Sequence, residues 1–107
     1  MADGNLFTDI AAGGAAEQFT ELLSAAQVRI ERIVSHGQAS PPGFWYDQDW
    51  HEWVVVLEGE AGLRFETESA PRVLRRGDYL AIPAHARHRV EWTDPARATV
   101  WLAVHMA

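Results

Sequence analysis

Residues 52–66 read EWVVVLEGEAGLRFE, two apolar runs on either side of Glu58-Gly59-Glu60. This pattern is typical of two β-strands joined by a tight turn, where Gly59 supplies the positive φ. Working outward, we expect further strands over residues 28–34, 79–82, 88–93 and 99–105. In residues 28–34 the alternation of apolar residues slips, which predicts a β-bulge there. Seven or eight short strands at near-regular spacing predict an all-β fold, a closed antiparallel barrel or a sandwich.

The first 26 residues differ from this pattern. Phe19, Leu22, Leu23 and Ala26 recur at the spacing of one helix face, which predicts a short helix over residues 15–26. We therefore expect residues 1–26 to form an N-terminal arm and short helix, and residues 27–107 to form the β-barrel. At 107 residues the chain has room for a single domain.

Composition excludes several kinds of chemistry. The chain has no cysteine, so it has no disulfide framework, thiolate zinc site or cysteine nucleophile. All nine basic residues are arginine, which excludes Schiff-base lysine chemistry. The net charge of −6 argues against nucleic acid as a partner. No apolar run could span a membrane, and no signal peptide is evident, so we expect a cytoplasmic protein.

Residues 77–88, GDYLAIPAHARH, carry a glycine, a proline and a histidine at a characteristic spacing. Gly77, Pro83 and His88 resemble the second motif of the cupin family, while His85 stands where that family usually has glycine. Residues 43–59, upstream of this segment, resemble the first cupin motif. The similarity covers about residues 28–105, and it implies a double-stranded jelly-roll β-barrel.

The first cupin motif is matched in part. Gly43, Glu52 and Gly59 are in register with it, but the two positions of its His-x-His pair are Tyr46 and Gln48. Residues of one parity on a strand face the same side, so Tyr46, Gln48 and Glu52 can all point into the barrel. The resemblance places His88 across the same cavity.

This resemblance implies a divalent metal ion inside the barrel, either Zn, Fe, Mn or Ni. Its predicted ligands are Gln48, Glu52 and His88. His51 has the opposite parity and is an alternative ligand if a bulge after Trp50 turns it inward. Tyr46 or His51 would serve as the acid or base.

Other polar and aromatic residues are candidates for the same pocket. Parity and neighbourhood place five of them in or around it, namely Tyr46, Trp50, His85, Arg87 and Trp92. We expect His36 and His105 to be structural or exposed instead.

Three functions follow from these features. The first is a metal-dependent enzyme acting on a small molecule, of the dioxygenase, isomerase or lyase type. The second is a metal-free module that binds a sugar or small acid, and the third is a structural or regulatory dimer. We also expect a homodimer. The apolar residues of the first 26 positions need cover, and they can pack on the barrel's own outer sheet or on a partner's. The resemblance to the cupin family, whose members commonly dimerise, favours the partner.

Overall fold

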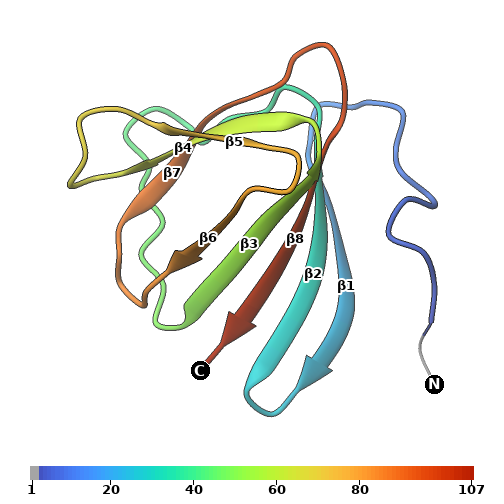
Figure 1. The fold of residues 1–107 in the computed structure, drawn as a ribbon, viewed down its shortest axis with the longest axis horizontal. Coiled ribbons are helices and arrows are strands. Elements are labelled where there is room, and N and C mark those ends of the chain that lie inside the picture. The colour runs from blue at the N-terminus through green and yellow to red at the C-terminus, as the bar shows by residue number, and fades with distance from the viewer. Residues whose placement is uncertain (1–2) are drawn as a thin grey trace.

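The computed structural model describes residues 3–107, and every regular element within this range is a β-strand (Figure 1). The strands are β1 (Gln18–Ala25), β2 (Val28–Ser35), β3 (His51–Glu58), β4 (Glu60–Phe65), β5 (Arg72–Arg75), β6 (Tyr79–Ile82), β7 (His88–Thr93) and β8 (Thr99–Met106). They form a five-stranded sheet, β1-β2-β8-β3-β6, and a three-stranded sheet, β5-β4-β7. The predicted all-β jelly-roll barrel is confirmed.

The hydrophobic core lies between the two sheets. Alternate residues of each strand face it, because successive side chains of a strand point to opposite sides. The core side chains are Val54, Val56, Ala61, Leu63, Leu74, Ile82, Trp101 and Ala103. The continuous apolar character of β3 and β8 in the sequence reflects their central position in the larger sheet.

The predicted N-terminal helix is wrong. Residues 18–25 form β1, which pairs antiparallel with β2 at the edge of the larger sheet. The pairing register shifts between Glu21 and Leu23, so Leu22 is the extra residue of a β-bulge. The bulge breaks the alternation of β1 and gives its apolar residues a spacing that imitates a helix. No helix among residues 3–107 has the length and hydropathy to span a membrane.

The same bulge corrects the prediction for residues 28–34. β2 pairs with β8 without any register shift from Val28 to Ser35, so the bulge is not in β2. It lies in the facing strand β1, opposite Ile30 and Glu31. The apolar–polar alternation of β2 slips because this strand is covered on both faces. Its outer face carries Arg32, which is only 4% exposed.

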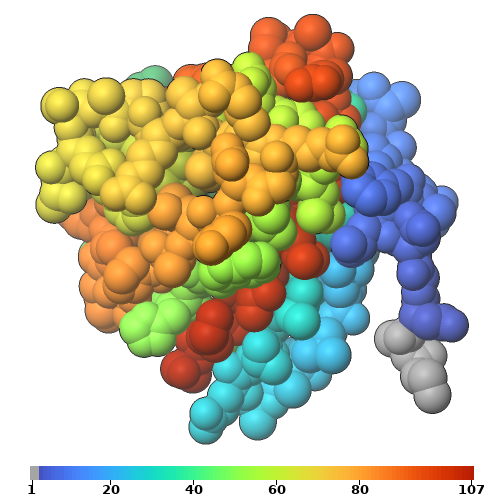
Figure 2. Space-filling view, in the orientation of Figure 1, coloured from blue at the N-terminus to red at the C-terminus, as the bar shows by residue number. Residues whose placement is uncertain are grey.

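The N-terminal arm covers Arg32. The Arg32 guanidinium donates hydrogen bonds to the carbonyl oxygens of Leu6 at 3.1 Å and Thr8 at 2.6 Å. Figure 2 shows the arm running along one side of the molecule beside β1. The arm is therefore fastened to the outside of the larger sheet, away from the barrel interior.

The β3–β4 hairpin turns at Gly59, as the sequence predicts, with a φ of +83°. A methyl group on Gly59 would lie 2.7 Å from the carbonyl oxygen of Ala98 and 2.5 Å from Oγ1 of Thr99. The turn therefore requires glycine for two separate reasons: its backbone conformation and its close approach to the start of β8.

Residues 38–48, here called the cover segment, run alongside β7 and extend the smaller sheet. Tyr46 and His88 exchange two backbone hydrogen bonds, of 2.7 and 3.2 Å. The Ser40 amide donates to the Val90 carbonyl oxygen at 2.8 Å. This pairing fixes which side chains of the cover segment face the barrel interior.

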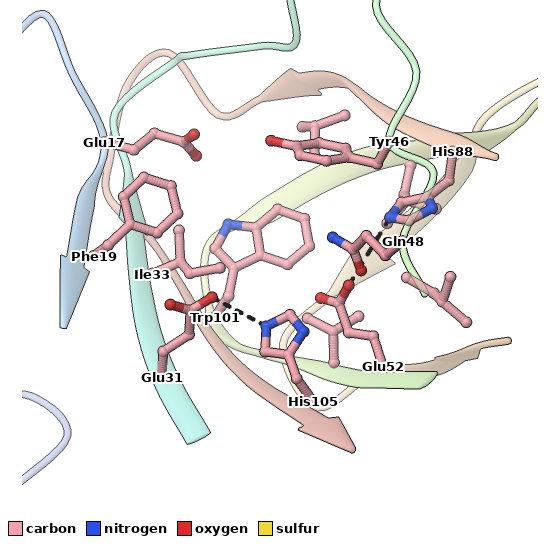
Figure 3. A pocket seen from close by; sticks show the side chains of 14 residues that line it. Glu17, Phe19, Glu31, Ile33, Tyr46, Gln48, Glu52, His88, Trp101 and His105 are labelled. Carbon is pink, nitrogen blue, oxygen red and sulfur yellow. Dashed lines mark hydrogen bonds and ion pairs between the residues drawn. The ribbon is translucent and has the colours of Figure 1, made fainter. Parts of the chain in front are cut away.

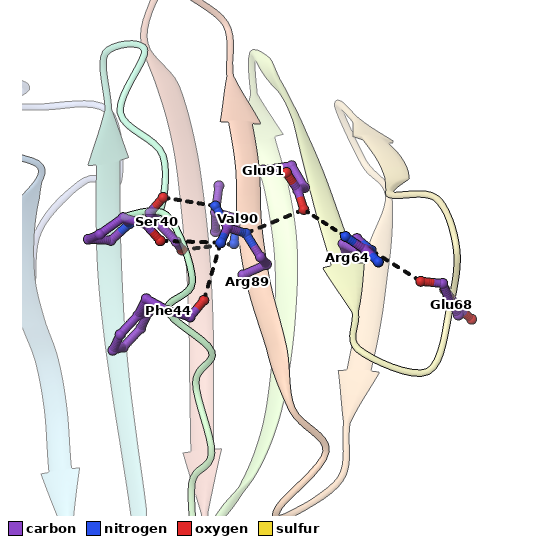
Figure 4. A network of polar contacts seen from close by, with 8 residues as sticks. Ser40, Phe44, Arg64, Glu68, Arg89, Val90 and Glu91 are labelled. Atoms are coloured by element: carbon purple, nitrogen blue, oxygen red, sulfur yellow. Dashed lines mark hydrogen bonds and ion pairs between the residues drawn. The ribbon is translucent and has the colours of Figure 1, made fainter.

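Arg89 of β7 holds the cover segment from outside the barrel (Figure 4). Its guanidinium donates to the carbonyl oxygens of Ser40 at 3.0 Å, Pro41 at 3.2 Å and Phe44 at 3.5 Å. Glu91 pairs with the same guanidinium at 3.3 Å. One nearly buried arginine thus holds three carbonyl groups of an otherwise irregular segment.

Candidate functional site

A cavity of about 100 Å³ lies inside the barrel between the two sheets (Figure 3). Its walls are apolar in the middle and carry polar groups at the ends. The lining residues are Glu17, Phe19, Glu31, Ile33, Tyr46, Gln48, Glu52, Val54, Leu63, Ile82, His88, Val90, Trp101 and His105. Phe19 is 59% exposed and therefore stands at the rim.

Four residues singled out in the sequence meet in this cavity. Tyr46 and Gln48 reach it from the cover segment, Glu52 from the beginning of β3 and His88 from the first position of β7. Alternation explains the first three, since positions 46, 48 and 52 share parity. The backbone pairing of Tyr46 with His88 brings the fourth beside them.

His88 and Glu52 form a buried pair. The His88 ring is held by its Nδ1, which lies 2.8 Å from the Ala86 carbonyl oxygen. A carbonyl oxygen only accepts, so Nδ1 carries the hydrogen and Nε2 of the neutral ring keeps a free lone pair. Nε2 lies 3.9 Å from Oε1 of Glu52, beyond hydrogen-bond distance. The Tyr46 ring stacks on the imidazole with centroids 5.4 Å apart.

A second imidazole lies in the same cavity and was missed by the sequence reasoning. His105 on β8 is opposite Glu52 on β3 in the antiparallel register, and its Nε2 lies 3.1 Å from Oε1 of Glu31. His105 is only 4% exposed. Its parity with Trp101 was the signal that could have found it, because both residues alternate on the inner face of β8.

Glu17 was also missed, since the predicted helix placed it outside the barrel. Its carboxylate accepts a hydrogen bond from the Ser35 hydroxyl. Ser35 in turn accepts from Nε1 of Trp101 at 3.1 Å, so its own hydrogen is directed to Glu17. Glu17 directly precedes β1, and the pairing of that strand with β2 positions this carboxylate at the cavity.

Burial dominates the electrostatics of the site. It raises the pKa of Glu52, an effect that His105 and then His88 oppose and Glu31 reinforces. Burial also raises the pKa of Tyr46, with Glu17 and the other two carboxylates adding to the effect. Tyr46 is therefore a protonated phenol at neutral pH, with a hydroxyl hydrogen to donate, and a poor source of phenolate for a metal.

His51 does not enter the cavity. β3 pairs with β8 in unbroken register from His51 to Val56, so no bulge follows Trp50. The His51 side chain is exposed, and its Nδ1 accepts a hydrogen bond from the Ala84 amide at 3.1 Å. The alternative ligand and acid–base roles predicted for His51 inside the barrel therefore have no structural support.

Trp92 was predicted on the cavity side because it shares parity with His88. The β4–β7 register shifts between Gly62 and Leu63, which pair with Trp92 and Val90, so Glu91 is an extra residue. This bulge turns Trp92 to the outer face of the smaller sheet. There its ring occupies the space above Gly62, where a Cβ would lie 2.2 Å from Nε1 of the indole.

The other three predicted pocket residues also lie outside the lining. His85 has a φ of +64° and an exposed ring whose Nδ1 lies 2.7 Å from Oδ1 of Asp47. Exposed Arg87 pairs with Glu66 at 3.1 Å. Trp50 packs edge-on against His105, with ring centroids 6.4 Å apart, and does not line the cavity itself.

Comparison with known proteins gives the family. The sequence model described as "Cupin domain" matches residues 31–105, well over half of the chain, and the chain therefore belongs to the cupin family. This confirms the resemblance found in the two motifs. No curated protein matches the chain.

Three solved structures illustrate the relationship. A protein named "putative mannose-6-phosphate isomerase" from Ralstonia eutropha JMP134 is 57% identical, with 97% of this chain and 96% of that chain covered and a TM-score of 0.95. An RmlC-like cupin from Methanocaldococcus jannaschii with a double-stranded β-helix fold is 16% identical over 92% and 86%, with a TM-score of 0.70. An RmlC-like cupin from Shewanella frigidimarina is 18% identical over 98% and 88%, with a TM-score of 0.74.

Cupin domains often hold a metal ion in the barrel. Here Glu52 and His88 carry donor atoms close enough to contact one ion together. Two donor atoms about 2.1 Å from one ion can be at most about 4.2 Å apart. The 3.9 Å between Nε2 of His88 and Oε1 of Glu52 lies within that limit. Among residues 3–107 no three His, Asp or Glu side chains converge as a metal-binding group. Gln48 lines the same cavity and carries a further oxygen donor.

Proposed function

We propose that this cupin binds a divalent metal ion together with a small molecule in its barrel cavity. The observation that carries the proposal is the free lone pair of His88 Nε2, held toward the buried Glu52 carboxylate by the Ala86 carbonyl. Metal-binding histidines characteristically donate their other ring N–H to such an acceptor. Gln48 supplies an amide oxygen from the cover segment.

When bound, the ion would supply Lewis acidity for a metal-dependent reaction on a small substrate. The chain's own residues would orient that substrate. Tyr46 donates a hydrogen bond from its phenol, whose raised pKa keeps it protonated at neutral pH. The apolar middle of the cavity, with Ile33, Val54 and Val90, excludes water from the contact.

The name of the Ralstonia relative points to a sugar phosphate, but the lining of this cavity opposes one. Three carboxylates face the cavity, those of Glu17, Glu31 and Glu52, and no arginine is among the lining residues. Phosphate is bound in proteins by arginine, lysine or exposed backbone N–H groups. A cavity of about 100 Å³ also has room for only a few waters or a molecule of similar bulk. We therefore propose a smaller, non-anionic ligand.

Calorimetric titration of protein without a His-tag, stripped with EDTA, tests the metal proposal. Mn²⁺, Zn²⁺ and Ni²⁺ are titrated into the wild type, Glu52→Gln, His88→Ala and the double variant. We expect each single variant to lose most of the affinity, and the double variant to lose little more, because the two ligands act as one unit.

The matched control is His51→Ala, which removes an exposed imidazole adjacent to Glu52 in sequence but outside the cavity. Its metal affinity should equal that of the wild type. Wild-type metal affinity in both Glu52→Gln and His88→Ala would refute the proposal. Loss of affinity in the His51→Ala control alone would also refute it.

A metal-free binding module is the second candidate, and the lack of a converging three-residue ligand group among residues 3–107 favours it. In this case Gln48, Tyr46 and Glu52 would hydrogen-bond the ligand directly. A ligand that raises the melting temperature equally with EDTA and with Mn²⁺ would support this function over the metal-dependent one.

We also propose a homodimer, as the sequence led us to expect. β1 is an edge strand of the larger sheet, and its Phe19 and Leu23 side chains are 59% and 47% exposed. A second copy would cover such an edge. Light scattering should give twice the 12.0 kDa chain mass, and Leu23→Glu should halve that value. A monomeric mass for the wild type at micromolar concentration contradicts the proposal.

A further inference from the structure

The cavity has two chemically different ends. Glu52 and His88 form what we call the imidazole end, which is the proposed metal position. Glu17 and Glu31 form the acidic end, on the side of β1 and β2, with Trp101 between the two ends (Figure 3). The proposed metal site leaves the acidic end without a function.

Both carboxylates of the acidic end have a spare oxygen. Glu17 uses Oε2 to accept from Ser35, and Glu31 uses Oε1 in its contact with His105. The other oxygen of each makes no hydrogen bond to residues 3–107. An ionised carboxylate has about four acceptor sites, so the acidic end keeps unused capacity for a donor.

A second observation concerns Nε2 of His88, which makes no hydrogen bond to residues 3–107. His88 is only 4% exposed, its Nε2 faces the cavity, and the nearest ionisable contact is Glu52 at 3.9 Å. An unpaired ring nitrogen on a nearly buried side chain that lines a cavity is available to a ligand in that cavity. This observation is independent of the carboxylates at the acidic end and lies across the cavity from them.

The charge of the lining selects the kind of ligand. Three carboxylates face two imidazoles and no arginine, so the lining disfavours an anion and favours a cation. The rings of Phe19, Tyr46 and Trp101 line the same cavity, and aromatic faces attract organic cations. Acidic groups and aromatic walls together are the surroundings that suit an ammonium group.

We infer that the small molecule is a compact amine, whose ammonium group binds between Glu17 and Glu31 while a hydroxyl or carbonyl oxygen at its other end reaches the imidazole end. This inference deepens the proposed function and rests on it for the role of the imidazole end. The cavity volume of about 100 Å³ limits the ligand to a short chain. Glu17 and Glu31 are then specificity-determining residues.

Three probes of equal size test the inference: 3-aminopropan-1-ol, propane-1,3-diol and 3-hydroxypropanoate. They differ in the charge of one end and keep a hydroxyl at the other. Binding is measured by calorimetry and by protein NMR, once with EDTA-treated protein and once with Mn²⁺. We expect the amine to bind about tenfold more tightly than the diol, because charged hydrogen bonds contribute roughly 1.5–3 kcal/mol, and the carboxylate to bind weakest.

Glu17→Gln and Glu31→Gln keep the side-chain shape and remove the charge. Each should reduce the preference for the amine over the diol to near unity. Glu66→Gln is the control, because Glu66 is exposed and pairs with Arg87 outside the cavity. It should keep the full preference. An NMR spectrum of each variant confirms the native fold.

The outcomes separate this inference from the proposed function. If Mn²⁺ binds but the amine does not bind more tightly than the diol, or does not bind at all, the inference is overturned and the metal site stands. If the amine binds with EDTA present and Mn²⁺ does not bind, the metal site is overturned and the amine site stands. Retention of the preference in both Glu17→Gln and Glu31→Gln also overturns the inference.

Discussion

Replacing Arg89 with alanine should loosen the cover segment and thereby weaken both stability and the cavity. The Arg89 guanidinium donates to Ser40 at 3.0 Å and Pro41 at 3.2 Å, with a longer contact to Phe44 at 3.5 Å. Its side chain is only 12% exposed. The two shorter bonds come from a charged donor, and such bonds contribute roughly 1.5–3 kcal/mol each.

The expected loss is smaller than the full sum of these bonds. The three carbonyl oxygens belong to a surface segment and recover water when the guanidinium is removed, so we expect a net cost of about 2–4 kcal/mol. For a domain of this size that corresponds to a melting temperature lower by roughly 8–16 °C. Arg89→Lys should fall in between, since one ammonium group cannot reach all three carbonyls.

The assay is urea unfolding together with the Mn²⁺ titration. Because the cover segment carries Tyr46 and Gln48, metal affinity should fall in Arg89→Ala while the protein is still folded. Arg87→Ala is the matched control, since Arg87 is 47% exposed and makes a single ion pair with Glu66. It should cost less than about 0.5 kcal/mol. A stability difference between the two variants below about 0.5 kcal/mol would refute the reasoning.

Three further predictions concern the pKa of Glu52, two turn glycines and the pKa of Tyr46. Burial raises the pKa of Glu52 above its ordinary value of 4.5, so the folded protein binds that proton more tightly than the unfolded chain. Metal-free protein should therefore lose stability as pH rises from 4.5 through the raised pKa. Glu52→Gln should remove this pH dependence. In urea unfolding at pH 7 this variant should be more stable than the wild type. Gly77→Ala should cost about 1 kcal/mol in urea unfolding, because its φ is +87° with nothing within 4 Å. Gly59→Ala should cost clearly more, since its φ of +83° is combined with the contact to the start of β8. In a Tyr79→Phe background, ultraviolet titration should show Tyr46 ionising above pH 10.0, and ionisation below this value contradicts its buried position.

Most of the strands, the hairpin turn and four cavity residues could be predicted from the sequence alone. Each depends on local information: apolar alternation, the backbone freedom of Gly59, and the shared parity of Tyr46, Gln48 and Glu52. Motif spacing added His88. Parity is reliable along one uninterrupted strand because consecutive side chains alternate strictly.

The remaining features depend on how the strands pair, and β-bulges account for many of them. The bulges at Leu22 and Glu91 exist because of the strands that pair with them, and each inverts parity beyond it. The first made β1 resemble a helix, and the second moved Trp92 to the outer face. Neither bulge has a local sequence signal.

The acidic end of the cavity shows the same limit at longer range. Glu17, Glu31 and His105 come from three segments that are widely separated in sequence and meet only when β1, β2 and β8 pair. Each residue is unremarkable on its own strand. Local geometry determines which face of its strand a side chain occupies, but long-range strand pairing determines which faces meet. The second carboxylate–imidazole pair of this cavity, Glu31 with His105, depends on that long-range pairing.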